Sequence, residues 1–288
     1  MLKRFLLTIT LLSVFVVPVY SGNISDSATY VKSGNAKVQL GQYTAAMHDF
    51  NKAIILDPNN AISYTNRGNL KLVLGQYFEA MQDFDRAISL DPNFAGAYYN
   101  RGTAKSNLGK HSEAIQDFDK AIDLDPNIAL AYYGRGTAKS NLGKHSEAMQ
   151  DFDRAISLDP NYAKAYYNRG IVKEELGKHS EALQDFDKVI SLEPNHAKAY
   201  YYRGTVKSSL SQHSEALQDF DKAISINPKY AKAYAGKGFT KIEQGKYNEA
   251  LQDFDKAISL EPNNMSFHEA RSLVQSLKIL ELIQEGSL

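Results

Sequence analysis

Small and apolar residues recur along the chain at a fixed interval of 34 residues. Prolines mark the interval most plainly, at Pro58, Pro92, Pro126, Pro160, Pro194, Pro228 and Pro262. A constant period of about 20 to 50 residues is the signature of a repeat protein, so we divide residues 27–264 into seven copies of one unit. The units are 27–60, 61–94, 95–128, 129–162, 163–196, 197–230 and 231–264, and the position of a residue within its unit is called its place.

Each unit contains two stretches with helical spacing. Place 20 is Ala and place 24 is Phe in every unit, and place 27 is Ala or Val. Spacings of four and three put these places on one face of a helix. Place 8 is always Gly, so small residues at places 8 and 20 allow the two helices to approach closely while the Phe fills the space beyond them. The Pro at place 32 ends the second helix, because proline disfavours helical geometry in the residue before it.

The turn between the two helices has its own pattern. Place 15 is Gly in six units, which is typical of a left-handed residue after a helix. Three residues later, Thr44, Ser112 and their equivalents at place 18 are expected to cap the second helix. Ser211 occupies place 15 in the sixth unit, and a left-handed backbone there should cost about 1 kcal/mol.

The segments outside the seven units have separate predicted roles. Residues 1–21 contain Lys3 and Arg4, an apolar stretch and small residues before a cleavage point, which predicts a secretory signal peptide followed by a short linker over 22–26. The apolar stretch is shorter than the roughly 20 residues of a membrane-spanning helix. Residues 265–288 predict a C-terminal capping helix and a short tail, with Ala270, Val274 and Leu277 on its core-facing stripe together with Leu273, Leu280 and Ile283.

Composition removes several classes of function. The chain has 33 basic and 33 acidic side chains, which argues against nucleic acid as a partner. It contains no cysteine, which excludes disulfides, thiolate metal sites and a cysteine nucleophile.

The repeated pattern closely resembles the tetratricopeptide repeat (TPR) family, whose motif has Leu, Gly, Tyr, Ala, Phe, Ala and Pro at places 7, 8, 11, 20, 24, 27 and 32. The resemblance covers all seven units and implies an all-α fold, a right-handed superhelical solenoid of helix-turn-helix units. Two departures recur: place 7 is Arg in five units, and place 11 is Lys in all seven. Both make the seam between the helices more polar than the family's motif.

The Arg at place 7 should face the second helix, where place 23 is always Asp. We therefore predict an ion pair in six of the seven units, all but the first, where place 7 is Ser33; the alternative is that both side chains are merely solvated. The predicted pairs are Arg67 with Asp83, Arg101 with Asp117, Arg135 with Asp151, Arg169 with Asp185, and Arg203 with Asp219, with Lys237 replacing Arg in the seventh unit.

The resemblance also implies a concave groove lined by the first helices, with places 2, 5, 9, 12 and 13 pointing into it. Carried onto this sequence, the groove has a ladder of tyrosines, flanked by small neutral side chains and, in the last three units, by a row of lysines. The predicted groove residues are Thr65, Asn69, Tyr99, Thr103, Ser106, Asn107, Tyr133, Thr137, Ser140, Asn141, Lys164, Tyr167, Lys198, Tyr201, Thr205, Ser208 and Lys232. Tyrosine supplies apolar area and a hydroxyl at low rotamer cost, which suits recognition, although these rings could instead pack against neighbouring units.

Candidate catalytic chemistry is sparse. His111, His145, His179 and His213 each precede Ser and Glu, but they share place 17 with tyrosines of the other units, which favours a packing role. Neighbouring repeats lie on the order of 10 Å apart, too far for two such imidazoles to share a zinc ion with bonds near 2 Å.

We therefore expect an exported, non-enzymatic scaffold without a cofactor that binds a peptide or helical segment of another protein in a Tyr-rich groove. Export would place it in the periplasm or the medium of a bacterium, or in the secretory pathway or outside a eukaryotic cell. One alternative is a structural assembly factor that acts through its convex or terminal surfaces, including self-association through the C-terminal helix. The other is a hydrolase or metal-binding protein that uses the repeated His-Ser-Glu elements. We expect no nucleic-acid partner and no membrane span after signal removal, and the partner's identity is not predictable from the sequence.

Overall fold

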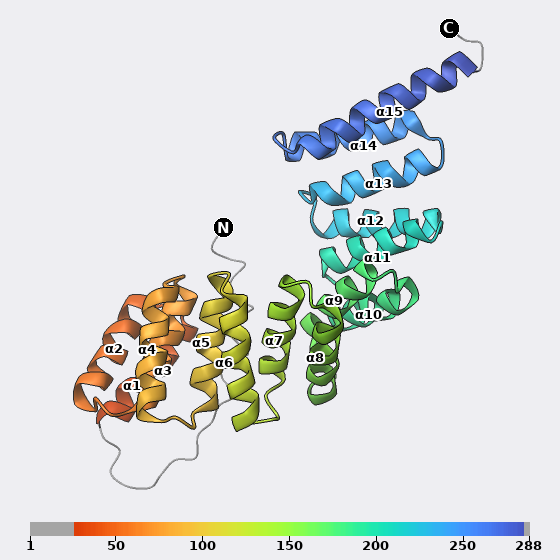
Figure 1. The fold of residues 1–288 in the computed structure, drawn as a ribbon. Helices are drawn as coiled ribbons and strands as arrows, with labels where there is room; N and C mark the ends of the chain where they lie inside the picture. The colour runs from red at the N-terminus through yellow and green to blue at the C-terminus, as the bar shows by residue number, and fades with distance from the viewer. Residues whose placement is uncertain (1–25, 285–288) are drawn as a thin grey trace. The chain divides into compact units, whose positions relative to one another are not determined.

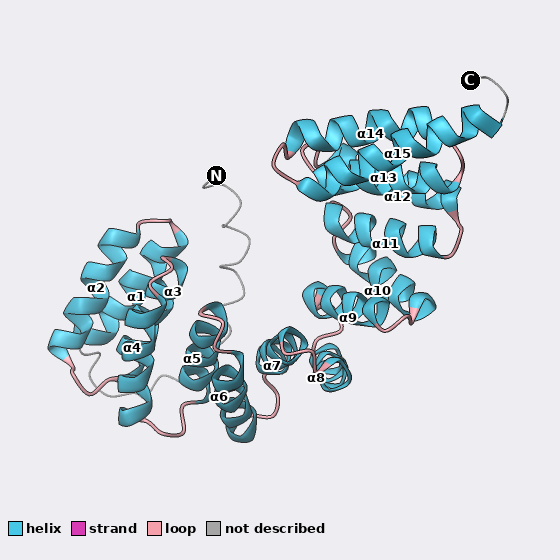
Figure 2. Cartoon of the chain, turned by 45° about the horizontal axis from the view of Figure 1, so that its top comes forward, coloured by secondary structure: helices cyan, strands magenta, loops and turns pink. Residues whose placement is uncertain are grey.

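The computed structural model describes residues 26–284, which form fifteen helices and no strands (Figures 1 and 2). The helices are α1 (Asp26–Gln39), α2 (Tyr43–Leu56), α3 (Ala61–Val73), α4 (Tyr77–Leu90), α5 (Ala95–Asn107), α6 (His111–Leu124), α7 (Ala129–Asn141), α8 (His145–Leu158), α9 (Ala163–Glu175), α10 (His179–Leu192), α11 (Ala197–Ser209), α12 (His213–Ile226), α13 (Ala231–Glu243), α14 (Tyr247–Leu260) and α15 (Met265–Gln284). The predicted signal peptide lies outside the described residues. Asp26, assigned to the linker, is instead the first residue of α1. None of the fifteen helices has the length and apolar character needed to cross a membrane.

The chain divides into two compact units, one ending at Leu158 and the other beginning at Asp159. The first contains α1 to α8, and the second contains α9 to α15. In both, consecutive helices pair into hairpins, and the first helices of successive hairpins also contact one another. Each compact unit is therefore a stack of helix pairs in which the first helices share one face.

In every hairpin the Phe ring of place 24 packs directly against the Gly of place 8. The seven Phe side chains are at most 1% exposed. A Cβ atom on Gly68 would lie 2.6 Å from the Phe84 ring, and one on Gly136 would lie 2.9 Å from the Phe152 ring. Because no real side chain tolerates such distances, place 8 must be glycine for the two helices to come this close.

A left-handed residue at place 15 turns the chain between the two helices. Six glycines there have φ between 71° and 75°, and Ser211 adopts the same geometry with φ 59°. In the third unit the turn is closed by the Lys110 amide, which donates to the Lys105 carbonyl oxygen at 2.9 Å. This is the hydrogen bond of a Schellman cap.

The predicted capping at place 18 is wrong. The second helices begin one residue earlier, at place 17, so Thr44 and Ser112 lie inside the first turn. The residues that precede α2, α4, α6, α10, α12 and α14 make no side-chain hydrogen bond to their helix. The backbone turn after the first helix already fixes where the second begins, so no side-chain cap is needed to define that point.

The structure brings the two members of all five predicted Arg–Asp pairs into contact. Arg135 donates from Nε and Nη2 to the two carboxylate oxygens of Asp151, at 3.0 and 2.5 Å. The shortest N–O distances in the other four pairs are 2.5 to 2.6 Å. The five Asp side chains are only 3 to 6% exposed, so the alternative of a solvated pair does not describe them. The seventh unit differs, because Lys237 lies 4.0 Å from Asp253 and only 2.6 Å from Asp221 of the preceding hairpin.

The ion pairs belong to a larger network that joins successive hairpins. Arg135 also donates from Nη1 to Asp119 of the preceding hairpin at 2.6 Å, and Lys139 at place 11 lies 2.9 Å from Asp151. The hydrogen bonds that the equivalent Arg101 donates to Asp117 raise the pKa of its guanidinium above the ordinary value, although burial opposes the charge. Both recurrent departures from the family's motif, the Arg of place 7 and the Lys of place 11, thus neutralise one buried carboxylate.

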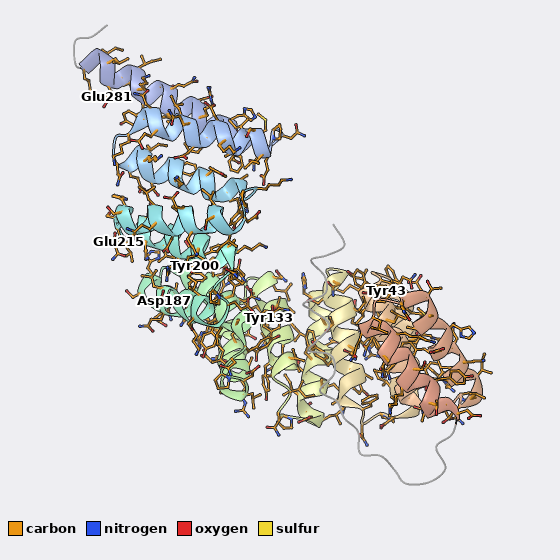
Figure 3. The ribbon with its side chains drawn as sticks, turned by 180° about the vertical axis from the view of Figure 1, so that it is seen from behind. Tyr43, Tyr133, Asp187, Tyr200, Glu215 and Glu281 are labelled. Carbon is orange, nitrogen blue, oxygen red and sulfur yellow. The ribbon has the colours of Figure 1, made fainter. Side chains whose placement is uncertain are left out.

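The guanidinium of each place-7 arginine also lies against the ring of a tyrosine at place 4. The Arg203 guanidinium lies 5.4 Å from the ring centre of Tyr200 and binds Asp187 of the preceding hairpin at 2.6 Å. Asp187 and Tyr200 are both labelled in Figure 3. The same stacking recurs for the arginines of four other hairpins. The guanidinium groups of Arg67, Arg101, Arg135 and Arg203 are therefore each held by two carboxylates, or by one carboxylate and one amide, and by one aromatic face.

Helix α15 packs on the last hairpin as the first helix of a further unit would. Arg271 takes the same place as the other arginines and binds Asp255 at 2.5 Å. Phe267, Ala270 and Val274 are buried against the hairpin. The predicted core stripe is only partly correct, because Leu273, Leu280 and Ile283 are each more than half exposed. No second helix follows α15 within residues 26–284 to cover them.

Replacing Ser211 by glycine should stabilise the protein by about 1 kcal/mol, because a non-glycine residue in the left-handed region carries strain of about that size. Urea denaturation followed by circular dichroism measures the change. The reverse substitution Gly177→Ser in the neighbouring turn is the matched control and should destabilise by a similar amount. A lower denaturation midpoint for Ser211→Gly would contradict this account.

Replacing Asp151 by asparagine should destabilise the protein by roughly 3 kcal/mol, because Arg135 and Lys139 would lose the buried charge that both of them bind. Asp119→Asn removes a carboxylate from the same arginine, but its side chain is 48% exposed, so the loss should be below about 1 kcal/mol. Thermal unfolding of the two variants compares them directly. Equal decreases in the midpoint of thermal unfolding would show that burial of the Asp151 carboxylate does not strengthen its ion pair with Arg135.

Candidate functional site

In the second compact unit, α11, α13 and the start of α15, together with Phe220 of α12, form a cleft of about 550 Å³. Its lining combines aromatic rings, hydroxyl groups and two opposite charges. The lining residues are Tyr201, Thr205, Ser208, Ser209, Phe220, Lys232, Ala235, Gly236, Phe239, Thr240, Glu243, Asn264, Ser266 and Phe267. A volume of this size is in the range of small-ligand pockets and of pockets for single anchoring side chains.

Four predicted groove residues, Tyr201, Thr205, Ser208 and Lys232, line this cleft. The sequence reasoning missed Phe239 and Glu243. Phe239 occupies place 9, which is Asn, Thr or Ile in the other units. An aromatic residue at a place expected to face the groove was the signal that could have revealed it. Its side chain is 48% exposed and meets the buried ring of Phe254 edge to face, with ring centres 5.0 Å apart.

Glu243 is held in position at one end of the cleft. The Ser208 hydroxyl donates to its Oε2 at 3.0 Å and lies 2.9 Å from the Thr240 hydroxyl. Nδ1 of His213 lies 3.4 Å from the same carboxylate oxygen. Ser208 therefore orients an acidic side chain of the cleft.

The predicted tyrosine ladder is half-buried, and its rings contribute to packing within the hairpins. Tyr99 and Tyr133, on α5 and α7, lie with their ring centres 6.0 Å from the Phe of their own hairpin, at the same tilt of 44°. Tyr133 is labelled in Figure 3. Burial raises the pKa of Tyr99. The two interpretations left open by the sequence, groove lining and packing, are thus not exclusive: Tyr201 lines the cleft and also packs on Phe220, with ring centres 5.9 Å apart.

The aromatic packing is densest in the second compact unit. Tyr167 packs on His196 and Tyr202, with ring centres 5.0 and 5.7 Å apart, and Tyr201 packs on Tyr230 at 5.2 Å. Burial raises the pKa values of Tyr201 and Tyr230. Two predicted groove residues, Tyr167 and Tyr201, therefore belong to a continuous cluster of five rings with His196, Tyr202 and Tyr230, which reaches the cleft at Tyr201.

The hydroxyls of the threonines predicted to line the groove donate hydrogen bonds within their own helices. The hydroxyls of Thr103, Thr137 and Thr205 each donate to the carbonyl oxygen four residues earlier, at 2.9 to 3.0 Å. Thr65 does the same and is only 6% exposed, so it is not a groove residue. A threonine hydroxyl in a helix readily donates to the backbone carbonyl of the preceding turn and is then not available to a ligand. The position of the residue within its unit does not reveal this hydrogen bond.

The remaining predicted residues vary in exposure. In the first compact unit Asn69, Ser106 and Ser140 are half-buried, whereas Asn107 and Asn141 are exposed. Asn107 donates from its side chain to the Thr103 carbonyl oxygen at 2.8 Å. In the second compact unit Lys164, Lys198 and Lys232 are exposed.

The repeated histidines do not assemble a metal site in the part of the chain that the structure describes. His111, His145, His179 and His213 are half-buried at the first residue of their helices. No group of three or more His, Asp or Glu side chains in residues 26–284 is arranged to hold a metal ion.

Comparison with known families identifies the repeat. Models described as tetratricopeptide repeat match residues 95–128, 163–196, 197–230 and 231–264, and residues 118–150. A model described as TPR repeat matches residues 34–75, 68–109 and 138–177. Together these matches run from residue 34 to residue 264.

Solved structures contain similar chains. YrrB, described as a TPR protein with an unusual peptide-binding site, is 31% identical over 64% of this chain and 95% of its own, with a TM-score of 0.54. The MamA protein is 30% identical over 57% of this chain and 96% of its own, with a TM-score of 0.53. A tetratricopeptide repeat protein from Parabacteroides merdae covers 87% of this chain and 99% of its own at 23% identity, with a TM-score of 0.63, and shares the fold. No curated protein matches the chain.

Proposed function

Because the chain belongs to the tetratricopeptide repeat family, a family of protein-interaction scaffolds, we propose that it is an exported, non-enzymatic scaffold that binds a segment of a partner protein through its first helices. The cleft beside α11, α13 and α15 carries this proposal. It presents Phe239, an exposed aromatic side chain, between a lysine and a glutamate.

The chemistry of the cleft suits a protein segment. An exposed aromatic ring in a concave, partly polar surface can anchor one apolar side chain of a partner, and such anchors account for most of the binding energy at interfaces. Lys232 and Glu243 can fix the orientation of the segment by charge. The similarity to YrrB, which is described as having a peptide-binding site, supports the same kind of ligand.

Export rests on residues 1–21, whose charged start, apolar stretch and small residues before the cleavage point are typical of a secretory signal. The protein would act after removal of this segment. Recovery of a chain that begins near residue 22 from the exported fraction is the observation that supports this part of the proposal.

Affinity capture from the exported fraction tests the cleft. Phe239→Ala should lower the recovery of specific partners at least about tenfold, because it removes the exposed anchor of the cleft. Phe78→Ala is the matched control, since that side chain is 61% exposed on α4 of the other compact unit and should have no effect. Quantitative mass spectrometry compares the three samples. Equal recovery with wild type and Phe239→Ala would refute binding at the cleft.

A second candidate function is self-association through α15, favoured by its exposed apolar residues. Leu273, Ile279, Leu280 and Ile283 are 52 to 55% exposed. If α15 pairs with a second copy, Ile279→Lys combined with Ile283→Lys should reduce the mass measured by light scattering to that of one chain. The control variant Met265→Lys changes an exposed apolar residue at the other end of α15 and should leave the mass unchanged. A single-chain mass for the wild type would exclude this function.

A further inference from the structure

The first helices of the second compact unit carry opposite charges at their two ends. Lys164, Lys198 and Lys232 are the second residues of α9, α11 and α13, and all three are exposed. Glu174 and Glu243 lie at the other ends of α9 and α13. At 1.5 Å per residue, the ten or eleven residues between lysine and glutamate on one helix correspond to about 15 to 17 Å.

These charges line up because the first helices run in the same direction. Near their ends, Ser208 of α11 bonds to Glu243 of α13. Near their starts, Tyr201 of α11 packs on Tyr230, the residue just before α13. The lysines are therefore gathered along one edge of the shared face, and the glutamates lie along the opposite edge.

The lysines of this edge differ from the other repeated lysines of the chain. At place 11, Lys173, Lys207 and Lys241 each lie within 3.0 Å of a buried Asp of their own hairpin. The exposed lysines of place 2 lie on the face of the first helices, where Lys232 lines the cleft. The lysines of place 2 are therefore available to a ligand, whereas the lysines of place 11 neutralise buried aspartates.

The first compact unit provides an internal comparison. Place 2 is Ala, Ile, Gly or Leu in its four hairpins, and places 12 and 13 are Val, Gln, Leu, Ser or Asn. The corresponding edges there carry no charge, although the two units share the same hairpin. Charge separation across the face is thus a property of the second unit and is not required by the fold.

We infer that the second compact unit binds an amphipathic helix of about three turns that lies parallel to α13, an inference that rests on the function proposed above. Acidic side chains in the first turn of the bound helix meet Lys232 at the lysine edge, and basic side chains in its last turn meet Glu243. Its apolar side chains contact Phe239 and Tyr201.

The charge order of the ligand follows from helix electrostatics. A free helix is itself stabilised by acidic residues near its N-terminus and by basic residues near its C-terminus. In the parallel orientation those favourable charges face their complements on the protein. In the antiparallel orientation like charges would meet at both edges, so the face selects direction as well as sequence.

Two synthetic peptides of about 14 residues test the inference. Both have the same composition and the same apolar face with helical spacing, but one has glutamates first and lysines last, and the other has the reverse order. Fluorescence anisotropy at low ionic strength should give a Kd about tenfold lower for the peptide with glutamates first. The difference should shrink as salt is added, because the edges are exposed to solvent.

Exchanging the charges of the cleft should exchange the preference. The double variant Lys232→Glu and Glu243→Lys should bind the reversed peptide more tightly. The matched control, Lys222→Glu combined with Glu215→Lys, makes the same charge changes at exposed residues of α12 outside the cleft and should keep the original preference. Circular dichroism verifies that both double variants are folded.

Each outcome has a defined meaning. Equal affinity for the two peptides, tighter binding of the reversed peptide by the wild type, or no binding of either would overturn the inference. The proposed function would survive all three results if partner capture still depended on Phe239, since a partner could then occupy the cleft in another conformation. Loss of that dependence would instead remove the proposed function.

Discussion

A phenylalanine ring packed against a glycine sets the distance between the two helices of every hairpin. With no Cβ at place 8, the Phe of place 24 approaches the backbone of the facing helix, and the alanine of place 20 leaves no bulk that would push the helices apart. This spacing puts Arg135 within reach of Asp151 in its own hairpin and of Asp119 in the one before. The ionic network therefore depends on the glycine as much as on its charged members.

The ionic network holds the hairpins together through only a few places of each first helix. Places 7 and 11 supply the cations of this network, whereas the residues at places 2, 12 and 13 differ between the two compact units. The first compact unit has uncharged residues at these places, such as Asn107 and Asn141, whereas the second has Lys232 and Glu243 on the same scaffold.

Much of the fold was predictable from the sequence because its determinants are local and repeated. The 34-residue period, Gly68 facing Phe84, the left-handed Ser211 and the pairing of Arg135 with Asp151 all follow from spacing within one unit. The cleft was harder to predict, because it depends on contacts between units. The hydrogen bond from Ser208 to Glu243 joins residues 35 apart in the sequence. The internal hydrogen bond of Thr205 also depends on a rotamer, which a place number does not specify.

Helix α15 meets the last hairpin through the contacts that any first helix makes, with Arg271 on Asp255 in place of a special terminal arrangement. The junction after residue 264 therefore repeats the contact that Arg101, Arg135 and Arg203 make with the preceding hairpin. A duplicated 34-residue segment inserted there would find a matching arginine ahead of it and a matching aspartate behind it. Such an insertion would lengthen the stack by one hairpin, and its residues at places 2, 12 and 13 would be free to differ from those of the other hairpins.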